Sequence, residues 1–115
     1  MTSRLFLTGI TCSGRHGANP GEKDAPQDFV VDLDVEVEAG GDELEQTADY
    51  RTVIRTARAT VEGESFDLLE MLANAVANAV LELDGVVKVA AIVHKPAAAR
   101  SNDVQGVAAG ATVER

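Results

Sequence analysis

The chain has 115 residues, of which 45% are hydrophobic, and its net charge is −9 because 19 acidic residues outnumber 10 basic ones. This length and composition predict a single domain over residues 1–115 that can bury a core. The acidic charge argues against nucleic acid and against an anionic membrane surface as partners, because both are bound mainly through Lys and Arg.

The only cysteine, Cys12, excludes an internal disulfide and a zinc site built from several cysteines. Its apolar neighbours predict a buried, unreactive thiol. No segment approaches the ~20 apolar residues of a membrane span, and the N-terminal residues lack the apolar run of a signal peptide. We therefore expect a cytoplasmic protein.

Two strands are predicted in the first third of the chain. Residues 5–12 mix β-branched and aromatic side chains, and a Ser-Gly pair follows them. Residues 14–27 contain three Gly and two Pro, and so long a loop in a small domain is often functional. Residues 29–38 are apolar at every odd position and mostly acidic at the even ones, which predicts a strand with one packed and one wet face.

Two helices are predicted next. Asp49 is placed to cap the first, and Gly63 to end it. Its apolar stripe comprises Tyr50, Val53, Ile54, Ala57 and Val61. Asp67 is placed to cap the second, which runs over residues 68–83 to Gly85.

Two further strands complete the pattern. Residues 86–94 form the third and end at Lys95-Pro96, and after a short Ala-rich loop residues 107–113 form the fourth. The order ββααββ predicts an α+β fold, with a four-stranded antiparallel sheet and two helices on one face. Such a sheet has two bare edges, and closing several copies into a shared β-barrel would cover them. We therefore expect a homo-oligomer.

Few residues suit a known chemistry, and each has a plain structural alternative. The chain lacks a nucleophile elbow and a phosphate-binding Gly-rich loop, and His16 and His94 lack the spacing of metal ligands, so we expect no metal and no cofactor. Lys95, at the end of an apolar strand, is either a partly desolvated proton shuttle or an ordinary solvated lysine.

Three other side chains carry the same ambiguity. Glu70 lies three residues after Asp67, so it fits a capping box, yet it could also accept two parallel N–H bonds from a flat amino-pyrimidinone ligand. Tyr50 is either a core aromatic with its hydroxyl at the surface or a residue that stacks on a ligand and donates a proton. Glu22 is by default a solvated loop carboxylate.

Five short motifs occur in order along almost the whole chain, and together they resemble the dihydroneopterin aldolase family. They are the His-Gly turn Gly14–Ala18 followed by Glu22, the strand entry Gln27–Asp32, the tyrosine segment Thr47–Tyr50, the helix start Phe66–Glu70 and the strand end Val93–Pro96.

The resemblance implies the tunnelling fold, in which four subunits close a barrel and two such rings can stack, so that the oligomer is a tetramer or an octamer. It also implies a lyase of folate biosynthesis that cleaves 7,8-dihydroneopterin into 6-hydroxymethyl-7,8-dihydropterin and glycolaldehyde, without a metal or a Schiff base. The active sites would lie between subunits. The implied catalytic residues are Lys95, Tyr50 and Glu22, and the implied pterin-binding residues are Glu22, Tyr50, Leu69, Glu70, Ala48, Asp49 and Ala18.

Some residues depart from the family pattern and leave alternatives open. Arg15 stands where many relatives have Tyr, and residues 97–101 lack the usual proline-containing segment. An epimerase of dihydroneopterin or of its triphosphate is the nearest alternative, although only Arg15, Lys23 and Arg100 could bind a triphosphate. A non-catalytic pterin-binding oligomer and an oxygen-dependent conversion of the same substrate are the others.

Overall fold

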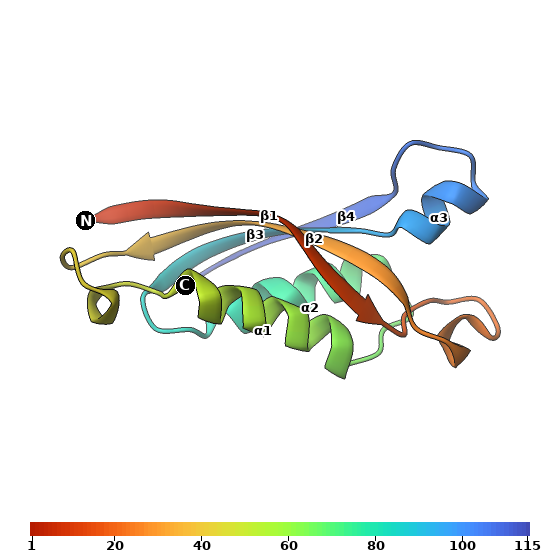
Figure 1. Cartoon of the computed structure of the whole chain (residues 1–115), viewed down its shortest axis with the longest axis horizontal. Helices are drawn as coiled ribbons and strands as arrows, with labels where there is room; N and C mark the ends of the chain where they lie inside the picture. The colour runs from red at the N-terminus through yellow and green to blue at the C-terminus, as the bar shows by residue number, and fades with distance from the viewer.

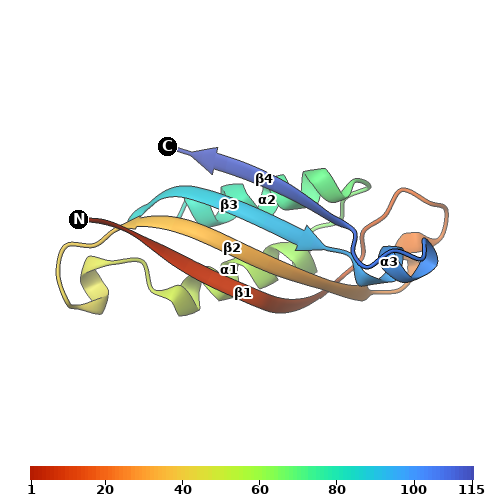
Figure 2. The same cartoon turned by 90° about the horizontal axis from the view of Figure 1, so that it is seen from above.

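The computed structural model describes residues 1–115 as two layers, a twisted sheet lying on a pair of helices (Figure 1). All neighbouring strands are antiparallel, in the order β1-β2-β3-β4 across the sheet (Figure 2). The predicted α+β architecture is thereby confirmed. The strands are β1 (Thr2–Gly14), β2 (Gln27–Glu38), β3 (Val86–His94) and β4 (Ala108–Glu114).

One face of the sheet packs on the helices and builds the core. The alternation in β2 is confirmed, because its odd-numbered residues from Phe29 to Val37 are all buried. Val31 lies opposite Ile10 of β1 and Val93 of β3, so the three strands present one continuous apolar surface. With few aromatics available, the core is made mainly of Val, Leu, Ile and Ala.

Helix α1 (Tyr50–Gly63) begins where the cap was predicted. The Asp49 side chain accepts a hydrogen bond from the backbone N–H of Arg51 at 2.9 Å, which satisfies one of the free donors at the helix start. Val53, Ala57 and Val61 form the buried stripe. Tyr50 was wrongly placed in that stripe, because its side chain, at the first position of the helix, is 51% exposed.

Helix α2 (Leu69–Leu81) begins later than predicted, and the capping box is wrong. Leu68 occupies the N-cap position and makes no side-chain cap bond. Asp67 forms an ion pair with Lys23 instead, with 2.5 Å between Asp67 Oδ1 and Lys23 Nζ. Because Leu68 is the N-cap, Asp67 and Glu70 have the right spacing from each other but each lies one position too early for a reciprocal cap.

The Ala-rich segment after Lys95 is a short helix, α3 (Pro96–Ser101), and not the predicted loop. Pro96 is the first residue of this helix, where its fixed φ is compatible with helical backbone. The alanines that follow have a high helix propensity. The segment projects from the right-hand end of the sheet in Figure 1. Strand β4 begins and ends one residue later than predicted.

Cys12 is buried in the core, as predicted, and burial raises the pKa of its thiol. A membrane-spanning helix is ruled out, because none of the helices combines the length and the apolar character that a bilayer crossing requires.

Strand β1 is interrupted by a bulge. Its pairing with β2 shifts between Leu7 and Ile10, and Gly9 lies there with φ +76°, a backbone conformation that favours glycine. The Gly9 N–H donates to Asp32 Oδ1 at 2.8 Å. The other carboxylate oxygen of Asp32 lies 2.7 Å from His94 Nε2, so one side chain ties three strands together on the open face of the sheet.

Candidate active site

The most distinctive feature of the site is an ion pair between Lys95 and Glu22. Lys95 follows β3 directly, and Glu22 opens a 3-10 turn, Glu22–Asp24, in the long loop. Lys95 Nζ lies 2.6 Å from Glu22 Oε2, and the two side chains are only 16% and 20% exposed. The Lys95 side chain is therefore partly desolvated and not an ordinary solvated lysine, and the solvated interpretation of Glu22 is wrong.

Hydrogen bonds hold the Glu22 carboxylate in its charged form. Its second oxygen accepts from both the backbone N–H and the side-chain amide of Asn19, each at 3.3 Å. The hydrogen bond from Lys95 lowers the pKa of Glu22, and the Asn19 backbone contact lowers it further. The site therefore holds a fixed carboxylate against the Lys95 side chain.

Gly17 makes this arrangement possible. A Cβ at Gly17 would lie 2.0 Å from the carboxyl carbon of Glu22, and the backbone there has φ +151°. A larger residue would therefore push the Glu22 side chain away from Lys95. The His-Gly turn was noticed in the sequence as a motif, but its steric role and the contact with Asn19 were not predicted.

The start of α2 lies at the same end of the molecule. The Gly17 N–H donates to the Phe66 carbonyl at 3.0 Å, and the Lys23–Asp67 ion pair joins the same two segments. Leu69 and Glu70 follow immediately, and the Glu70 side chain is exposed. Ala18 is exposed on the loop that carries Glu22. We call this region, from Gly17 to Glu22 with Lys95 and the start of α2, the lysine end.

The remaining predicted residues lie elsewhere. Ala48, Asp49 and Tyr50 precede and begin α1, and a Cβ at Gly85 would lie 3.6 Å from the Ala48 nitrogen, which places them beside the start of β3. Lys95 lies beyond the other end of β3, about 30 Å away at 3.3 Å per residue. The single chain therefore does not bring Tyr50 to Lys95. We call the segment Ala48–Tyr50 the tyrosine end.

The basic residues considered for a triphosphate do not form a free cluster. The Arg15 guanidinium donates to the Asp24 carbonyl at 2.6 Å and also contacts the Lys23 carbonyl. Lys23 is paired with Asp67, and Arg100 lies exposed on α3. Two of the three cations are therefore committed to contacts within the chain.

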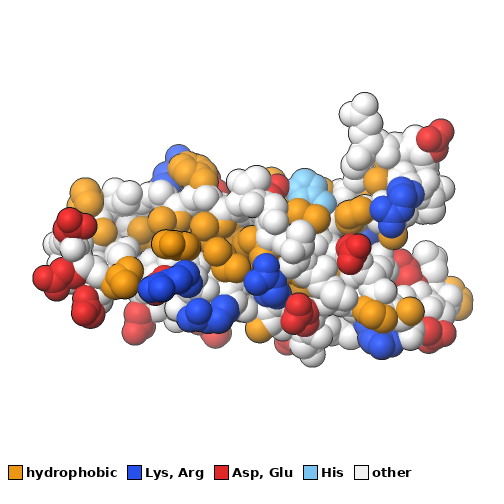
Figure 3. All heavy atoms as spheres, viewed as in Figure 1, with side chains coloured by type: hydrophobic (Ala, Val, Ile, Leu, Met, Phe, Trp, Pro, Cys, Tyr) orange, Lys and Arg blue, Asp and Glu red, His pale blue; other side chains and the backbone are white.

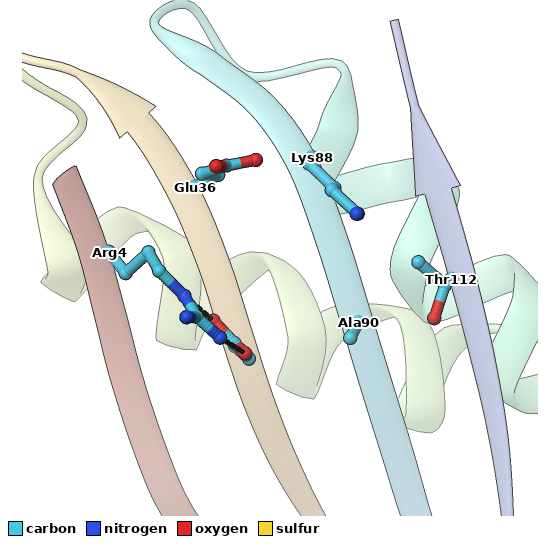
Figure 4. Close-up of a pocket in the computed structure, with 6 residues that line it drawn as sticks. Arg4, Glu36, Lys88, Ala90 and Thr112 are labelled. Carbon is cyan, nitrogen blue, oxygen red and sulfur yellow. Dashed lines mark hydrogen bonds and ion pairs between the residues drawn. The ribbon is translucent and has the colours of Figure 1, made fainter. Parts of the chain in front are cut away.

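A separate hollow of about 320 Å³ lies on the open face of the sheet (Figure 4). Arg4 forms an ion pair there with Asp34, and Glu36 lies opposite Lys88 in the strand register. Its charges largely balance one another, and the hollow includes none of the predicted site residues. Nowhere in the chain do three His, Cys, Asp or Glu side chains gather as a metal site would require.

Known proteins identify the family. A family model described as dihydroneopterin aldolase matches residues 5–112. A dihydroneopterin aldolase from Streptomyces coelicolor is 39% identical over 97 residues, which cover 81% of this chain and 82% of that protein.

The chain belongs to the dihydroneopterin aldolase family.

Two solved dihydroneopterin aldolases share the fold of this family member. The enzyme from Burkholderia thailandensis, bound to guanine, superposes with a TM-score of 0.81 at 24% identity, over 99% of this chain and 92% of that one. The Escherichia coli enzyme, in complex with neopterin, gives 0.79 at 21% identity, over 98% of each chain. The tunnelling fold predicted from the sequence is thereby confirmed at the level of the subunit.

Proposed function

We propose that this chain is a lyase of folate biosynthesis that cleaves 7,8-dihydroneopterin into 6-hydroxymethyl-7,8-dihydropterin and glycolaldehyde. The largely buried Lys95–Glu22 pair carries the proposal, since it holds a proton donor against a fixed carboxylate at the same end of the molecule as the exposed Glu70. The dihydroneopterin aldolase from Escherichia coli, which shares the fold, was solved with neopterin. A cytoplasmic location is part of the proposal and rests on the family alone.

The substrate's own C6=N5 imine can accept the electrons of the broken bond, so the protein mainly has to transfer protons. Removal of the proton from the 2′-hydroxyl lets C2′ become the carbonyl of glycolaldehyde as the C1′–C2′ bond breaks. The electron pair of that bond passes to C6, and the C6=N5 imine of the substrate takes it up as N5 gains a proton. Protonation at C1′ and loss of the N5 proton then give the hydroxymethyl product. Positioned acid–base groups suffice for these steps.

Each residue has a place in this scheme. Glu70 accepts two parallel N–H bonds from the amino-pyrimidinone edge of the pterin, beside the backbone of Leu69. Lys95 moves protons between the 2′-hydroxyl, N5 and water, and Glu22 holds the Lys95 ammonium in position and closes the loop over the ligand near Ala18. Tyr50 stacks on the ring or protonates the enol-like intermediate, and the neighbouring backbone of Ala48 and Asp49 forms the rest of that wall.

Because Tyr50 and Lys95 lie far apart in a single chain, the proposal includes a homo-oligomer in which neighbouring copies share their sites. Both outer strands, β1 and β4, have an unpaired edge within the chain. Figure 3 shows apolar side chains between the sheet and a group of basic side chains over α1. Helix α1 carries Arg51, Arg55 and Arg58 on this side, and Arg58 Nε donates to the Thr11 carbonyl of β1 at 2.9 Å.

Copies that meet edge to edge, β1 against β4, would pair the two free edges and close a barrel as a tetramer or a stacked octamer. An isolated monomer should then be inactive, because it cannot supply Tyr50 to its own Lys95. Activity that persists in a dilute preparation shown to be monomeric by light scattering would contradict the shared site.

Product analysis tests the reaction. Wild type, Lys95→Ala and Lys88→Ala are incubated with 7,8-dihydroneopterin in chelator and without oxygen. Lys88 lies on β3, the strand that leads to Lys95, but its side chain is on the open face of the sheet (Figure 4). It therefore serves as the matched control. We expect glycolaldehyde and the hydroxymethyl product from wild type and Lys88→Ala, and a rate about 10²–10⁴-fold lower from Lys95→Ala.

Other outcomes point to other activities. If wild type yields only the 2′-epimer, the chain is an epimerase. If cleavage survives unchanged in Lys95→Ala, the proton-transfer role of Lys95 is wrong. If substrate binds and remains intact, the chain is a pterin-binding oligomer.

A further inference from the structure

His16 is a buried histidine that takes no part in the scheme above. It is only 2% exposed, so its ring does not reach a ligand. It stacks on Phe66, with ring centroids 6.0 Å apart, and meets Phe29 edge-on at 5.1 Å. A buried polar ring must find hydrogen-bond partners, and both ring nitrogens of His16 have one.

Both partners are backbone groups, and they fix the tautomer. The Phe66 N–H donates to His16 Nδ1 at 3.0 Å, so Nδ1 carries no proton. His16 Nε2 lies 2.8 Å from the Val61 carbonyl, which can only accept, so Nε2 carries the proton. Only the neutral imidazole satisfies both contacts. Burial lowers the pKa of His16, which favours the same neutral form.

These contacts join three segments that the chain order separates. Val61 belongs to the last turns of α1, Phe66 leads into α2, and His16 opens the loop that carries Glu22. Next to the His16 bond, the Gly17 N–H donates to the Phe66 carbonyl at 3.0 Å, so two adjacent bonds clasp residues 16–17 to Phe66. The carbonyl of His16 also accepts from the Gln27 side chain at 3.1 Å, at the start of β2.

The clasp matters because α2 lacks a side-chain cap of its own. No side chain at Leu68 caps the helix, so its first turn is positioned by contacts that come just before it. These are the bonds at Phe66, the hydrogen bond from Ser65 Oγ to the Arg15 carbonyl at 2.6 Å, and the Lys23–Asp67 ion pair. Glu70 lies in that turn. On the other side of the clasp, Gly17 lies against the Glu22 carboxylate that pairs with Lys95.

We propose that His16 is a positioning residue, whose neutral ring fixes the start of α2 against the loop of Glu22 and so sets the distance between the ligand-anchoring carboxylate and the Lys95–Glu22 pair. This inference rests on the proposed function for the role of Glu70. His16 itself, being buried, does not contact the substrate.

Two substitutions separate the two ring contacts. In His16→Asn the side-chain oxygen can lie where Nδ1 lies and accept the Phe66 N–H, but nothing reaches Val61. In His16→Gln the amide can reach the Val61 carbonyl, but the acceptor for Phe66 is displaced. Both variants lose the aromatic contacts with Phe29 and Phe66, so each is the control for the other.

Guanine is the first probe, because it presents an amino-pyrimidinone edge and needs no catalysis to be measured. By calorimetry, we expect His16→Gln to bind guanine about tenfold or more weakly than His16→Asn, since a buried N–H left without its acceptor shifts the helix start. In the aldolase assay the same difference should appear mainly in KM. Equal guanine affinity in two variants of equal melting temperature would overturn the proposal.

Two measurements on the free protein complete the test. Nitrogen-15 NMR should find Nδ1 unprotonated and Nε2 protonated at neutral pH, and a charged imidazolium would overturn the proposal. A carboxyl titration should find the pKa of Glu22 lowered in wild type and His16→Asn, but closer to its ordinary value in His16→Gln. Since neither measurement depends on turnover, an inactive wild type would refute the proposed function alone.

Discussion

The predicted site residues differ in burial between the lysine end and the tyrosine end of the molecule. At the lysine end, the charged side chains of Lys95 and Glu22 are largely buried, and each has its partner in the same chain. At the tyrosine end, Tyr50 projects from the first turn of α1 into solvent. Burying a charge is costly unless it is paired, and at the lysine end both members of the ion pair come from the same chain. In the proposed shared site, Tyr50 would act only where a neighbouring subunit meets the tyrosine end.

The largest expected effect is the recovery of activity when two inactive variants, each altered at one of the two ends, are mixed. Lys95→Ala retains the tyrosine end and Tyr50→Ala retains the lysine end, and each alone should fall to about a thousandth of wild-type activity. If the ends meet between subunits, mixed oligomers contain about a quarter of sites with both native residues, and activity should return to that level.

The mixing experiment requires proof that subunits have exchanged. Native mass spectrometry of the reassembled sample identifies mixed oligomers, and the assay is then run on the same sample. Mixed oligomers that remain inactive would show that Tyr50 and Lys95 do not share a site across the interface.

A smaller effect, confined to the lysine end, is expected from Gly17→Ala. The added methyl group would overlap the Glu22 carboxyl, so the Glu22 side chain must turn away from Lys95. We expect kcat/KM to fall about 100-fold while the oligomer still forms. Gly63→Ala is the matched control, because a Cβ at Gly63 meets nothing within 4 Å. Full activity in Gly17→Ala would show that the Glu22–Lys95 contact is dispensable.

At the tyrosine end, Asp49 is expected to act through stability. Its side chain caps α1 and also pairs with Arg51 at 2.8 Å. Asp49→Ala should lower the melting temperature by a few degrees, whereas Asp49→Asn, which can still cap, should lower it less. Equal melting temperatures, together with a loss of guanine affinity in both, would instead make Asp49 a binding residue, as the family resemblance implies.

The smallest effect concerns pH. Because Lys95 lowers the pKa of Glu22 in the folded chain, the pair stabilises the fold fully above the ordinary Glu pKa of 4.5 and loses this contribution as the pH falls through the folded value. The difference in melting temperature between wild type and Glu22→Gln should therefore be constant near neutral pH and shrink below pH 4.5. A difference that persists unchanged in acid would mean that the ion pair does not stabilise the fold.

Most of the fold could be predicted because its signals are local. The alternation along β2 and the stripe on α1 repeat over many residues, and the Asp49 cap needs only its neighbours in sequence. The start of α2 could not be predicted in this way. Asp67 has the right type and spacing for a cap, but its preferred partner is Lys23, 44 residues earlier in the chain.

For the site, too, the local features could be predicted and the long-range contacts could not. The residue types of Lys95, Glu22 and Glu70 were evident, yet their burial was not, since it depends on Gly17 having no side chain and on Asn19 turning toward Glu22. His16 gave no sequence signal beyond the His-Gly pair. Both of its ring partners are backbone groups about 50 residues away, and a backbone group leaves no trace in the sequence.

The bulge at Gly9 also limits which strands can pair with the exposed edge of β1. Strand β1 is a 13-residue edge, long enough to template unlimited strand-by-strand growth. With Gly9 turned out of register and tied to the Asp32 side chain, that edge is split into two short arms at an angle. The edge of β1 therefore presents no long, straight row of backbone hydrogen-bonding groups to an unrelated strand. A strand with a matching bend can still pair with either half of it.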